Sequence, residues 1–151
     1  MLEKGDISSP EYAELKRRFG WEFNGMRLHE YYFGSLRNNK EMLNKSSEIY
    51  KQIEHDFGSF DDWQKDFNAL AMIRGIGWVI LYYDTVSKRL FNIWINEHET
   101  SHLAGATPII VLDVFEHAWM VEYGNKADYI KTYFDAINWE VIENRFEDAI
   151  R

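Results

Sequence analysis

The sequence predicts an α+β fold, with a helical N-terminal half followed by a small three-stranded antiparallel sheet flanked by helices. Apolar residues recur at helical spacing up to about residue 56, and three β-rich runs then precede two further helical segments. Helices segregated around one antiparallel sheet are typical of α+β domains. We expect a single compact unit at 1–151, with a helical part at 10–56 and an α+β part at 57–151.

The helical part opens on a clear start signal. Ser9 followed by Pro10 places an N-cap before proline at the first helical position, which predicts a short helix ending near Gly20. A long helical region is expected from about 24 to about 54, with soft spots at 38–39 and 44–47 where it could divide. The apolar residues that indicate it are Leu28, Tyr32, Leu36, Met42, Ile49 and Ile53.

The remaining elements follow from caps, glycines and β-branched residues. Ser59 is expected to cap a helix running from about 61 to 73, and Gly75-Ile76-Gly77 marks the change from helix to sheet. The expected strands are 78–83, 90–95 and 108–112, of which the first two form a hairpin. The expected final helices are about 127–137 and about 139–149.

Composition excludes several classes of function. The net charge of −8 argues against a nucleic-acid partner, because phosphate binding requires a basic face. The absence of cysteine leaves His, Asp, Glu and Tyr as the ligands for any metal. No apolar run has the length of a membrane span and the N-terminus lacks a signal-peptide core, so we expect no membrane partner and a cytoplasmic location.

The run Leu112-Asp113-Val114-Phe115-Glu116-His117-Ala118-Trp119 carries the strongest chemical signal. Asp113 and His117 are four residues apart, directly after the apolar run 108–112. A buried strand that ends in Asp and leads into a helix carrying His can direct an anionic oxygen and a neutral nitrogen at one cation, a donor mix that iron, manganese and zinc accept. The alternative is a helix-capping Asp and a buried His bonded to a backbone carbonyl.

This octapeptide resembles the C-terminal metal motif of the iron/manganese superoxide dismutases. Further resemblances are Phe57-Gly58-Ser59-Phe60 at a helix entry, Gly75-Ile76-Gly77-Trp78 at a turn, and Asn138-Trp139 near the end. The resemblance implies a superoxide-dismutase-like fold in which Asp113 and His117 are metal ligands. It also implies a homodimer or higher homo-oligomer in which Glu116 reaches the partner's metal-binding His.

The N-terminal half departs from the family pattern. In the register anchored on Tyr32-Phe33, Asn24 occupies the position of the family's metal-binding His and Leu28 that of a second His. Tyr32 alone survives from that face, where the resemblance implies a phenol that relays protons beside the substrate; the alternative is a core aromatic. The next family helix, which carries another metal His, is deleted, so two of the four protein ligands are missing.

Other histidines are candidates to replace them. His98 falls where some family members place a His that hydrogen-bonds beside the metal, so it is either a third ligand or a hydrogen-bonding residue. His29 lies off the family's metal-facing stripe, but a rotated helix would bring it in as a fourth ligand; the alternative is a core His. Glu99 and His102 show a spacing known from di-iron bundles but occur once, on an expected loop, so His102 is at most an accessory ligand.

Two residues are expected to support the site rather than bind metal. Trp78 would shield the metal or simply pack in the core, and Glu116 would lie at a dimer interface or on a helix surface. Two functions follow. One is dismutation of superoxide at a mononuclear iron or manganese site, one ion per chain, with zinc as the alternative metal and an altered ligand set. The other is a non-catalytic dimeric module that binds metal or a partner.

Overall fold

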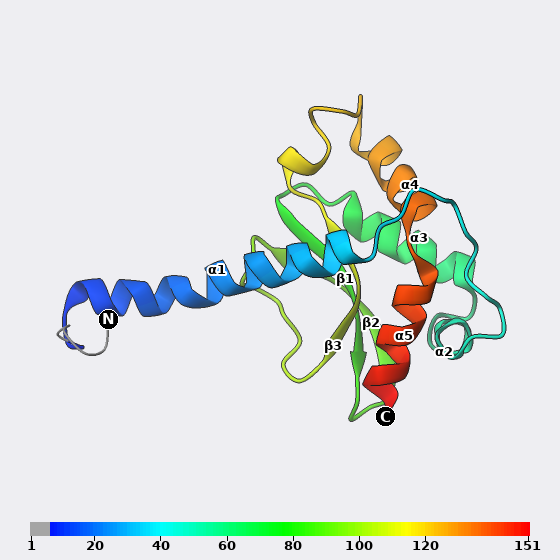
Figure 1. Cartoon of the computed structure of the whole chain (residues 1–151), viewed down its shortest axis with the longest axis horizontal. Helices are drawn as coiled ribbons and strands as arrows, with labels where there is room; N and C mark the ends of the chain where they lie inside the picture. The colour runs from blue at the N-terminus through cyan, green and yellow to red at the C-terminus, as the bar shows by residue number, and fades with distance from the viewer. Residues whose placement is uncertain (1–6) are drawn as a thin grey trace.

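The computed structural model describes residues 7–151 (Figure 1). The single unit predicted at 1–151 also includes residues 1–6, which lie outside the described residues. The predicted α+β class is confirmed. In chain order the elements are α1 (Pro10–Gly34), α2 (Glu48–Phe57), α3 (Phe60–Ala71), β1 (Gly77–Asp84), β2 (Arg89–Asn96), β3 (Thr107–Asp113), the 3-10 turn η1 (Glu116–Ala118), α4 (Lys126–Ala136) and α5 (Trp139–Ile150).

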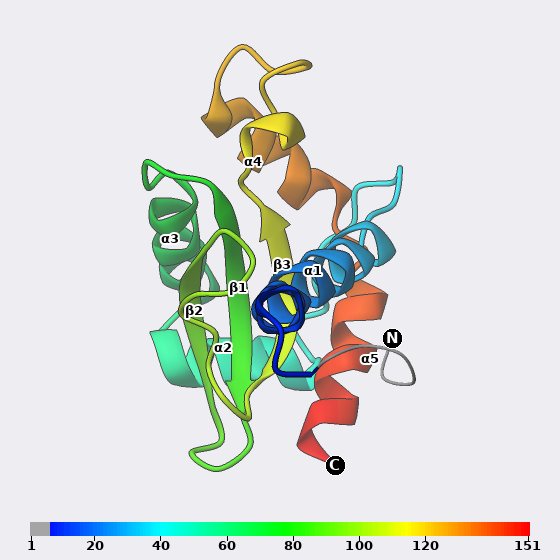
Figure 2. The same cartoon turned by 90° about the vertical axis from the view of Figure 1, so that its left-hand side faces the viewer.

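The three strands form one antiparallel sheet in the order β2-β1-β3. The central strand β1 is buried from Gly77 to Tyr83, because both faces of the sheet are covered. On one face the indole of Trp78 contacts the ring of His29 on α1. On the other face Tyr83 packs edge-on against Phe146 of α5, with ring centroids 5.1 Å apart. Figure 2 shows α1 end-on in front of β3. The sheet is therefore the layer that aligns α1 with the carboxyl end of β3.

The first helix is longer than predicted. Ser9 caps it as expected, its hydroxyl accepting from the Tyr12 N–H, but the helix continues through Gly20 to Gly34 instead of ending near Gly20. A single glycine within a helix costs about 1 kcal/mol relative to alanine, which does not interrupt a helix of 25 residues. The N-terminal part of α1 projects beyond the rest of the molecule (Figure 1).

The helical region expected at 24–54 is divided over residues 35–47, which are not helical and include both of the expected soft spots, although the break is longer than either. In this segment the Arg37 N–H donates to the carbonyl of Ala136 and Ser35 accepts from the Asn138 N–H, each at 2.8 Å. Leu43 is buried whereas Met42, expected on the apolar stripe, is exposed. The backbone groups of the segment thus pair with the junction between α4 and α5, and Ser47 caps the separate helix α2.

Gly77 fixes where the sheet begins. Its φ is +143°, and a Cβ at this position would lie 1.9 Å from the carbonyl oxygen of Ile95, so a side chain cannot be accommodated. The Gly77 carbonyl also accepts from the Val114 N–H at 2.9 Å. These two contacts bring the start of β1 against the end of β3, where Trp78 pairs with Asp113.

The C-terminal helices lie close to their predicted positions, while the segment after β3 does not. His117 was expected on a helix, but the chain forms only the short turn η1 before α4. Arg145 of α5 donates to the carbonyl of Ile109 at 2.7 Å and its guanidinium lies over the ring of Tyr31, which ties α5 to β3 and α1. Among residues 7–151, no helix is both long and apolar enough to cross a membrane.

Candidate metal centre

Asp113 is a buried carboxylate held at the end of β3. Its residue is 2% exposed, and Oδ1 accepts from the Phe115 N–H at 2.9 Å. Burial raises the pKa of Asp113, although the Phe115 N–H and His117 act in the opposite direction. Because Oδ1 is occupied by the backbone, Oδ2 is the oxygen left for a side chain or a cation.

His117 follows on η1 and approaches that oxygen. Its Nε2 lies 3.1 Å from Oδ2 of Asp113, and its ring stacks on Phe115 with centroids 5.3 Å apart. The side chain is 60% exposed, so the ring faces the outside of the molecule. The turn η1, rather than a longer helix, therefore presents the imidazole beside the carboxylate.

His29 reaches the same carboxylate from α1. Its Nδ1 lies 2.6 Å from the carbonyl oxygen of Gly25, which can only accept, so Nδ1 carries the proton. The other nitrogen, Nε2, lies 3.6 Å from Oδ2 of Asp113. In the neutral ring this Nε2 presents a lone pair to a carboxylate oxygen, an arrangement that a cation or an additional proton between the two atoms would stabilise.

The three side chains fit a metal ion. One donor atom from each of His29, Asp113 and His117 can be chosen so that all lie within 4.8 Å of one another. Adjacent ligands at bonds of about 2.1 Å from one ion lie roughly 3.0–3.4 Å apart in octahedral or tetrahedral shells. The separations of 3.1 Å and 3.6 Å from the shared Asp113 oxygen are close to that range. Two imidazoles and one carboxylate form a donor set that suits iron with positions left open.

His98 lies next to this group but outside it. Its Nδ1 accepts from the indole N–H of Trp78 at 2.9 Å, so Nε2 carries the proton of the neutral ring and no lone pair remains for a metal. Nε2 and Cδ2 lie against Gly25 of α1. Burial lowers the pKa of His98, and the neighbouring His29 lowers it further. Of the two roles considered for His98, the geometry favours the hydrogen-bonding one.

His102 and Glu99 are not drawn into the centre. Nε2 of His102 lies 2.9 Å from the carbonyl of His98 and Nδ1 lies 2.6 Å from the hydroxyl of Tyr82. Since the carbonyl only accepts, Nε2 is the donor and Nδ1 accepts from the phenol. Both ring nitrogens of His102 are thereby occupied, while Glu99 is exposed on the turn after β2. This arrangement does not favour the accessory-ligand role.

Tyr32 faces a cavity of about 420 Å³ that Asp113, His29 and His117 also line. The hydroxyl of Tyr129 lies 2.7 Å from the carbonyl of Asp113 and 3.0 Å from the hydroxyl of Tyr32. A phenol has one proton, so Tyr129 donates to the carbonyl and accepts from Tyr32. Burial raises the pKa of both phenols, which keeps them protonated at neutral pH.

The two supporting residues occupy contrasting positions. Trp78 is fully buried, its indole N–H donates to Nδ1 of His98, and its ring lies edge-on to the ring of His29 with centroids 4.8 Å apart. Glu116 is exposed at the first position of η1, beside the exposed ring of His117. Trp78 therefore acts on the position of the histidines, and Glu116 is open to the surroundings.

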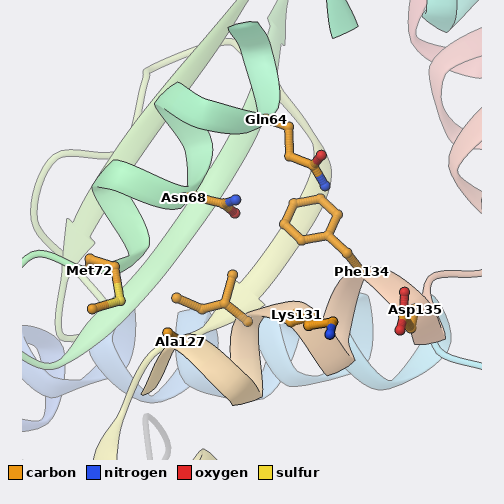
Figure 3. A pocket seen from close by; sticks show the side chains of 8 residues that line it. Gln64, Asn68, Met72, Ala127, Lys131, Phe134 and Asp135 are labelled. Carbon is orange, nitrogen blue, oxygen red and sulfur yellow. The ribbon is translucent and has the colours of Figure 1, made fainter. Parts of the chain in front are cut away.

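A second cavity, of about 330 Å³, lies between α3 and α4 (Figure 3) and offers no comparable donor set. Its lining includes Asn68 and Lys131, with Asp135 as its one carboxylate. Asp135 already forms an ion pair with Lys40 at 2.5 Å. The cavity at Asp113 is therefore the candidate metal centre.

Fold and site together define an α+β protein whose candidate functional site brings together two histidines and one carboxylate that could hold a metal ion. Comparison with known proteins narrows this class. Residues 44–145 match the family described as iron/manganese superoxide dismutases, C-terminal domain. The chain belongs to the iron/manganese superoxide dismutase family.

Individual relatives agree with this assignment. The chain is 38% identical over 149 residues to the superoxide dismutase [Fe] of Aquifex pyrophilus, covering 98% of this chain and 69% of that protein. It is 33% identical over 141 residues to the superoxide dismutase [Fe] of Methanothermobacter thermautotrophicus, covering 91% and 68%. It is 36% identical over 104 residues to the superoxide dismutase [Mn] of Haloarcula marismortui, covering 68% and 51%.

Two residues of the site were not anticipated from the sequence. Gly25 lies under the ring of His98 and binds His29 through its carbonyl, and Tyr129 holds the carbonyl of Asp113. Gly25 is one turn before His29, so a histidine four residues after a helical glycine was an available signal. Tyr129 is far from the motif in sequence, and only the packing of α4 places it there.

Proposed function

We propose that the protein binds one iron or manganese ion per chain through His29, Asp113 and His117 and that it dismutates superoxide at this centre. The observation that carries the proposal is the shared Oδ2 of Asp113, which two imidazole nitrogens approach at 3.1 Å and 3.6 Å. The names of the relatives, which include both iron and manganese superoxide dismutases, support the choice of metal and substrate.

Each ligand residue has a distinct task. Asp113 supplies a negative charge whose position is fixed by the Phe115 N–H. His29 is oriented by the Gly25 carbonyl, which directs Nε2 to the centre and raises its basicity as a ligand. His117 supplies the second nitrogen from the exposed side. An iron or manganese ion bound here supplies one-electron redox chemistry between its divalent and trivalent states.

Tyr32 and Tyr129 hold protons beside the centre. The Tyr32 hydroxyl faces the cavity and donates to Tyr129, whose own proton is committed to the Asp113 carbonyl. A phenol that remains protonated at neutral pH and borders the substrate space can act as a general acid when peroxide leaves. We assign Tyr32 this role, which requires its hydroxyl to turn from Tyr129 towards the cavity and its proton to return from solvent through the open cavity.

The resemblance also suggests a homodimer in which Glu116 accepts from His117 of a second copy. The exposure of both side chains at η1 supports this part of the proposal. An interfacial carboxylate so placed would hold the tautomer of that imidazole. The cytoplasmic location remains a prediction from the sequence.

A non-catalytic metal-binding module is the second candidate. It is favoured by the replacement of a family metal ligand by Asn24, whose amide instead lies 3.5 Å from His102. It is also favoured by His98, whose lone pair is committed to Trp78. Three protein donors, one of them on the exposed His117, can also hold an ion that does not change its oxidation state, and this role requires nothing further of the site.

Metal titration tests the site before any activity is measured. Wild-type apoprotein is expected to bind one manganese or iron(II) ion per chain by calorimetry and elemental analysis, with a rise in melting temperature. His29→Ala is expected to weaken binding at least tenfold, as is typical of a lost ligand. His55→Ala is the matched control, since His55 is a 76% exposed histidine paired with Asp56. Equal affinities for the two variants would contradict the assignment of His29.

Superoxide consumption then separates the two candidates. The enzyme predicts that metal-loaded wild type consumes superoxide faster than an equal concentration of free manganese or iron ion, and that Tyr32→Phe reduces the rate with little change in metal content. A rate equal to that of the free ion, with stoichiometric metal still bound, supports the non-catalytic module.

A further inference from the structure

The cavity of about 330 Å³ between α3 and α4 (the α3–α4 cavity) has the size of a small-molecule site. The apolar part of its lining is formed by Met72, Ala127, Ile130 and Phe134. The polar part is formed by Gln64 and Asn68 of α3 and by Lys131 and Asp135 of α4 (Figure 3). Sites for organic ligands combine an apolar wall with a few polar groups that fix the orientation of the ligand. The lining of the α3–α4 cavity has this composition.

Asn68 borders the cavity with a side-chain amide that lacks a partner. Its Oδ1 is buried and accepts no hydrogen bond from residues 7–151, and Gln64, one turn earlier on α3, also has no side-chain hydrogen bond to these residues. Figure 3 shows the Asn68 amide extending from α3 toward the side chains of α4. Buried oxygens are usually hydrogen-bonded, because an unpaired acceptor loses its hydration without compensation. A hydroxyl or N–H that enters the cavity would supply this donor after a small rotation of the amide.

The charge that is free to meet a ligand in this cavity is positive. The carboxylate of Asp135 is already paired with Lys40, whose Nζ lies 2.5 Å from its Oδ1. Lys131 lies one turn before Asp135 on α4 and forms no ion pair with any residue that the structure describes. A cationic ligand would have to displace Lys40 from Asp135, whereas a carboxylate would meet the Lys131 ammonium without a competing partner. The α3–α4 cavity therefore favours an anionic group at Lys131.

The apolar wall of the cavity favours a flat aromatic body. The ring of Phe134 is held by edge-on contacts with Trp63 and Phe67, at centroid distances of 6.0 Å and 5.7 Å. Met72, at the end of α3, is 51% exposed, and a thioether packs favourably against an aromatic ring. A rigid ring also loses little conformational entropy when it binds. An aromatic ring is therefore the body that suits this wall.

We propose that the α3–α4 cavity binds a small aromatic carboxylic acid that carries a hydroxyl or N–H group at the opposite end of its ring. The carboxylate pairs with Lys131, the ring packs on Phe134, and the donor bonds to Oδ1 of Asn68. The probe is 4-hydroxybenzoate, which has these three features on one rigid ring. With roughly ten non-hydrogen atoms it is expected to bind with a Kd of about 0.1–1 mM. Binding does not depend on the candidate metal centre, whose residues line a different cavity.

Matched probes and variants test each contact, with binding followed by amide chemical shifts of the isotope-labelled protein. Benzoate lacks the hydroxyl and 4-hydroxybenzamide lacks the charge, so each is expected to bind about fivefold more weakly than 4-hydroxybenzoate. Lys131→Gln is expected to lower the affinity for 4-hydroxybenzoate to that for 4-hydroxybenzamide, and Asn68→Ala is expected to lower it to that for benzoate. Lys45→Gln, at an exposed lysine outside the cavity, is the matched control and is expected to leave the Kd unchanged.

The same titrations can overturn the proposal. It fails if wild type shows no saturable shifts up to about 10 mM 4-hydroxybenzoate, which is ten times the weakest Kd expected. It also fails if Lys131→Gln binds as tightly as wild type, a test that does not depend on Asn68→Ala because Lys131 is exposed and its substitution leaves the core intact. A carboxylate can also bind a metal ion, so His29→Ala is the third control. This variant is expected to retain the wild-type Kd, and loss of binding with shifts around Asp113 would place the ligand at the metal centre instead.

Discussion

The ring of His98 rests directly on the backbone of Gly25. A Cβ at residue 25 would lie 3.1 Å from Cδ2 and 3.2 Å from Nε2 of His98. The ring cannot retreat freely, because its Nδ1 is bonded to the buried indole of Trp78. The carbonyl of the same glycine holds Nδ1 of His29, so one residue sets the distance of α1 from the sheet and the orientation of a metal-ligand candidate.

Gly25→Ala is therefore expected to separate α1 from the sheet. Overpacking of this kind costs about 1–3 kcal/mol of unfolding free energy, measured by urea denaturation. Metal affinity is expected to fall as well, because His29 moves with the helix. Gly20→Ala is the matched control: nothing lies within 4 Å of its Cβ, and the substitution is expected to stabilise by about 0.5–1 kcal/mol. The argument fails if both substitutions stabilise.

The two phenols beside Asp113 are expected to differ in their contribution to stability. Tyr129→Phe leaves the buried carbonyl of Asp113 without its donor, at a cost of about 1–3 kcal/mol in unfolding free energy. Tyr32→Phe removes a hydroxyl that donates only to Tyr129 and is expected to cost less than about 1 kcal/mol. Chemical denaturation of the two variants measures the difference, and equal losses would show that the proton order inferred here is wrong.

Asp56 is expected to make stability depend on acid pH. Burial raises its pKa, but hydrogen bonds from Gln52 and the Leu90 N–H outweigh burial, so the net pKa lies below the usual 3.8. A depressed carboxylate pKa stabilises the fold above about pH 4, and this contribution is lost as the pH falls through the folded-state pKa. Asp56→Asn is expected to lose about 1–3 kcal/mol at pH 7, a difference that shrinks below pH 4.

A matched aspartate controls for the loss of charge alone. Asp148 is 72% exposed and pairs with Arg151 on the surface of the C-terminal end. Asp148→Asn is expected to change the unfolding free energy by less than about 0.5 kcal/mol at either pH. Thermal denaturation between pH 3 and pH 7 measures both variants, and parallel pH profiles of Asp56→Asn and wild type would refute the assignment.

Elements with strong local signals were predictable from the sequence. The caps at Ser9 and Ser59 and the β-branched runs gave the start of α1, the start of α3 and the three strands to within about a residue or two. Residues 35–47 were not, because their stability comes from backbone pairing with Ala136 and Asn138, far away in sequence. Helical spacing alone could not reveal that Leu43, rather than its neighbour, would be buried.

The candidate site also contains one part that local sequence predicts and one part that depends on the folded structure. The adjacency of Asp113 and His117 follows from their spacing after a strand, whereas the position of His29 depends on how α1 is rotated on the sheet. His98 illustrates the limit of residue type as a guide. An imidazole is a candidate ligand in any sequence, but an indole N–H at 2.9 Å commits its lone pair, and only the folded structure shows that contact.

The donors of the centre lie far apart in the sequence, His29 on α1 and the other two at the end of β3 and on η1. An ion bound there would act as a cross-link closing a loop that contains most of the fold, in a protein without cysteines to form disulfides. Closing a long loop lowers the entropy of the unfolded chain, so metal binding would raise the free energy of unfolding as well as supply redox chemistry. Resistance to proteolysis would then report the metal supply of the cell.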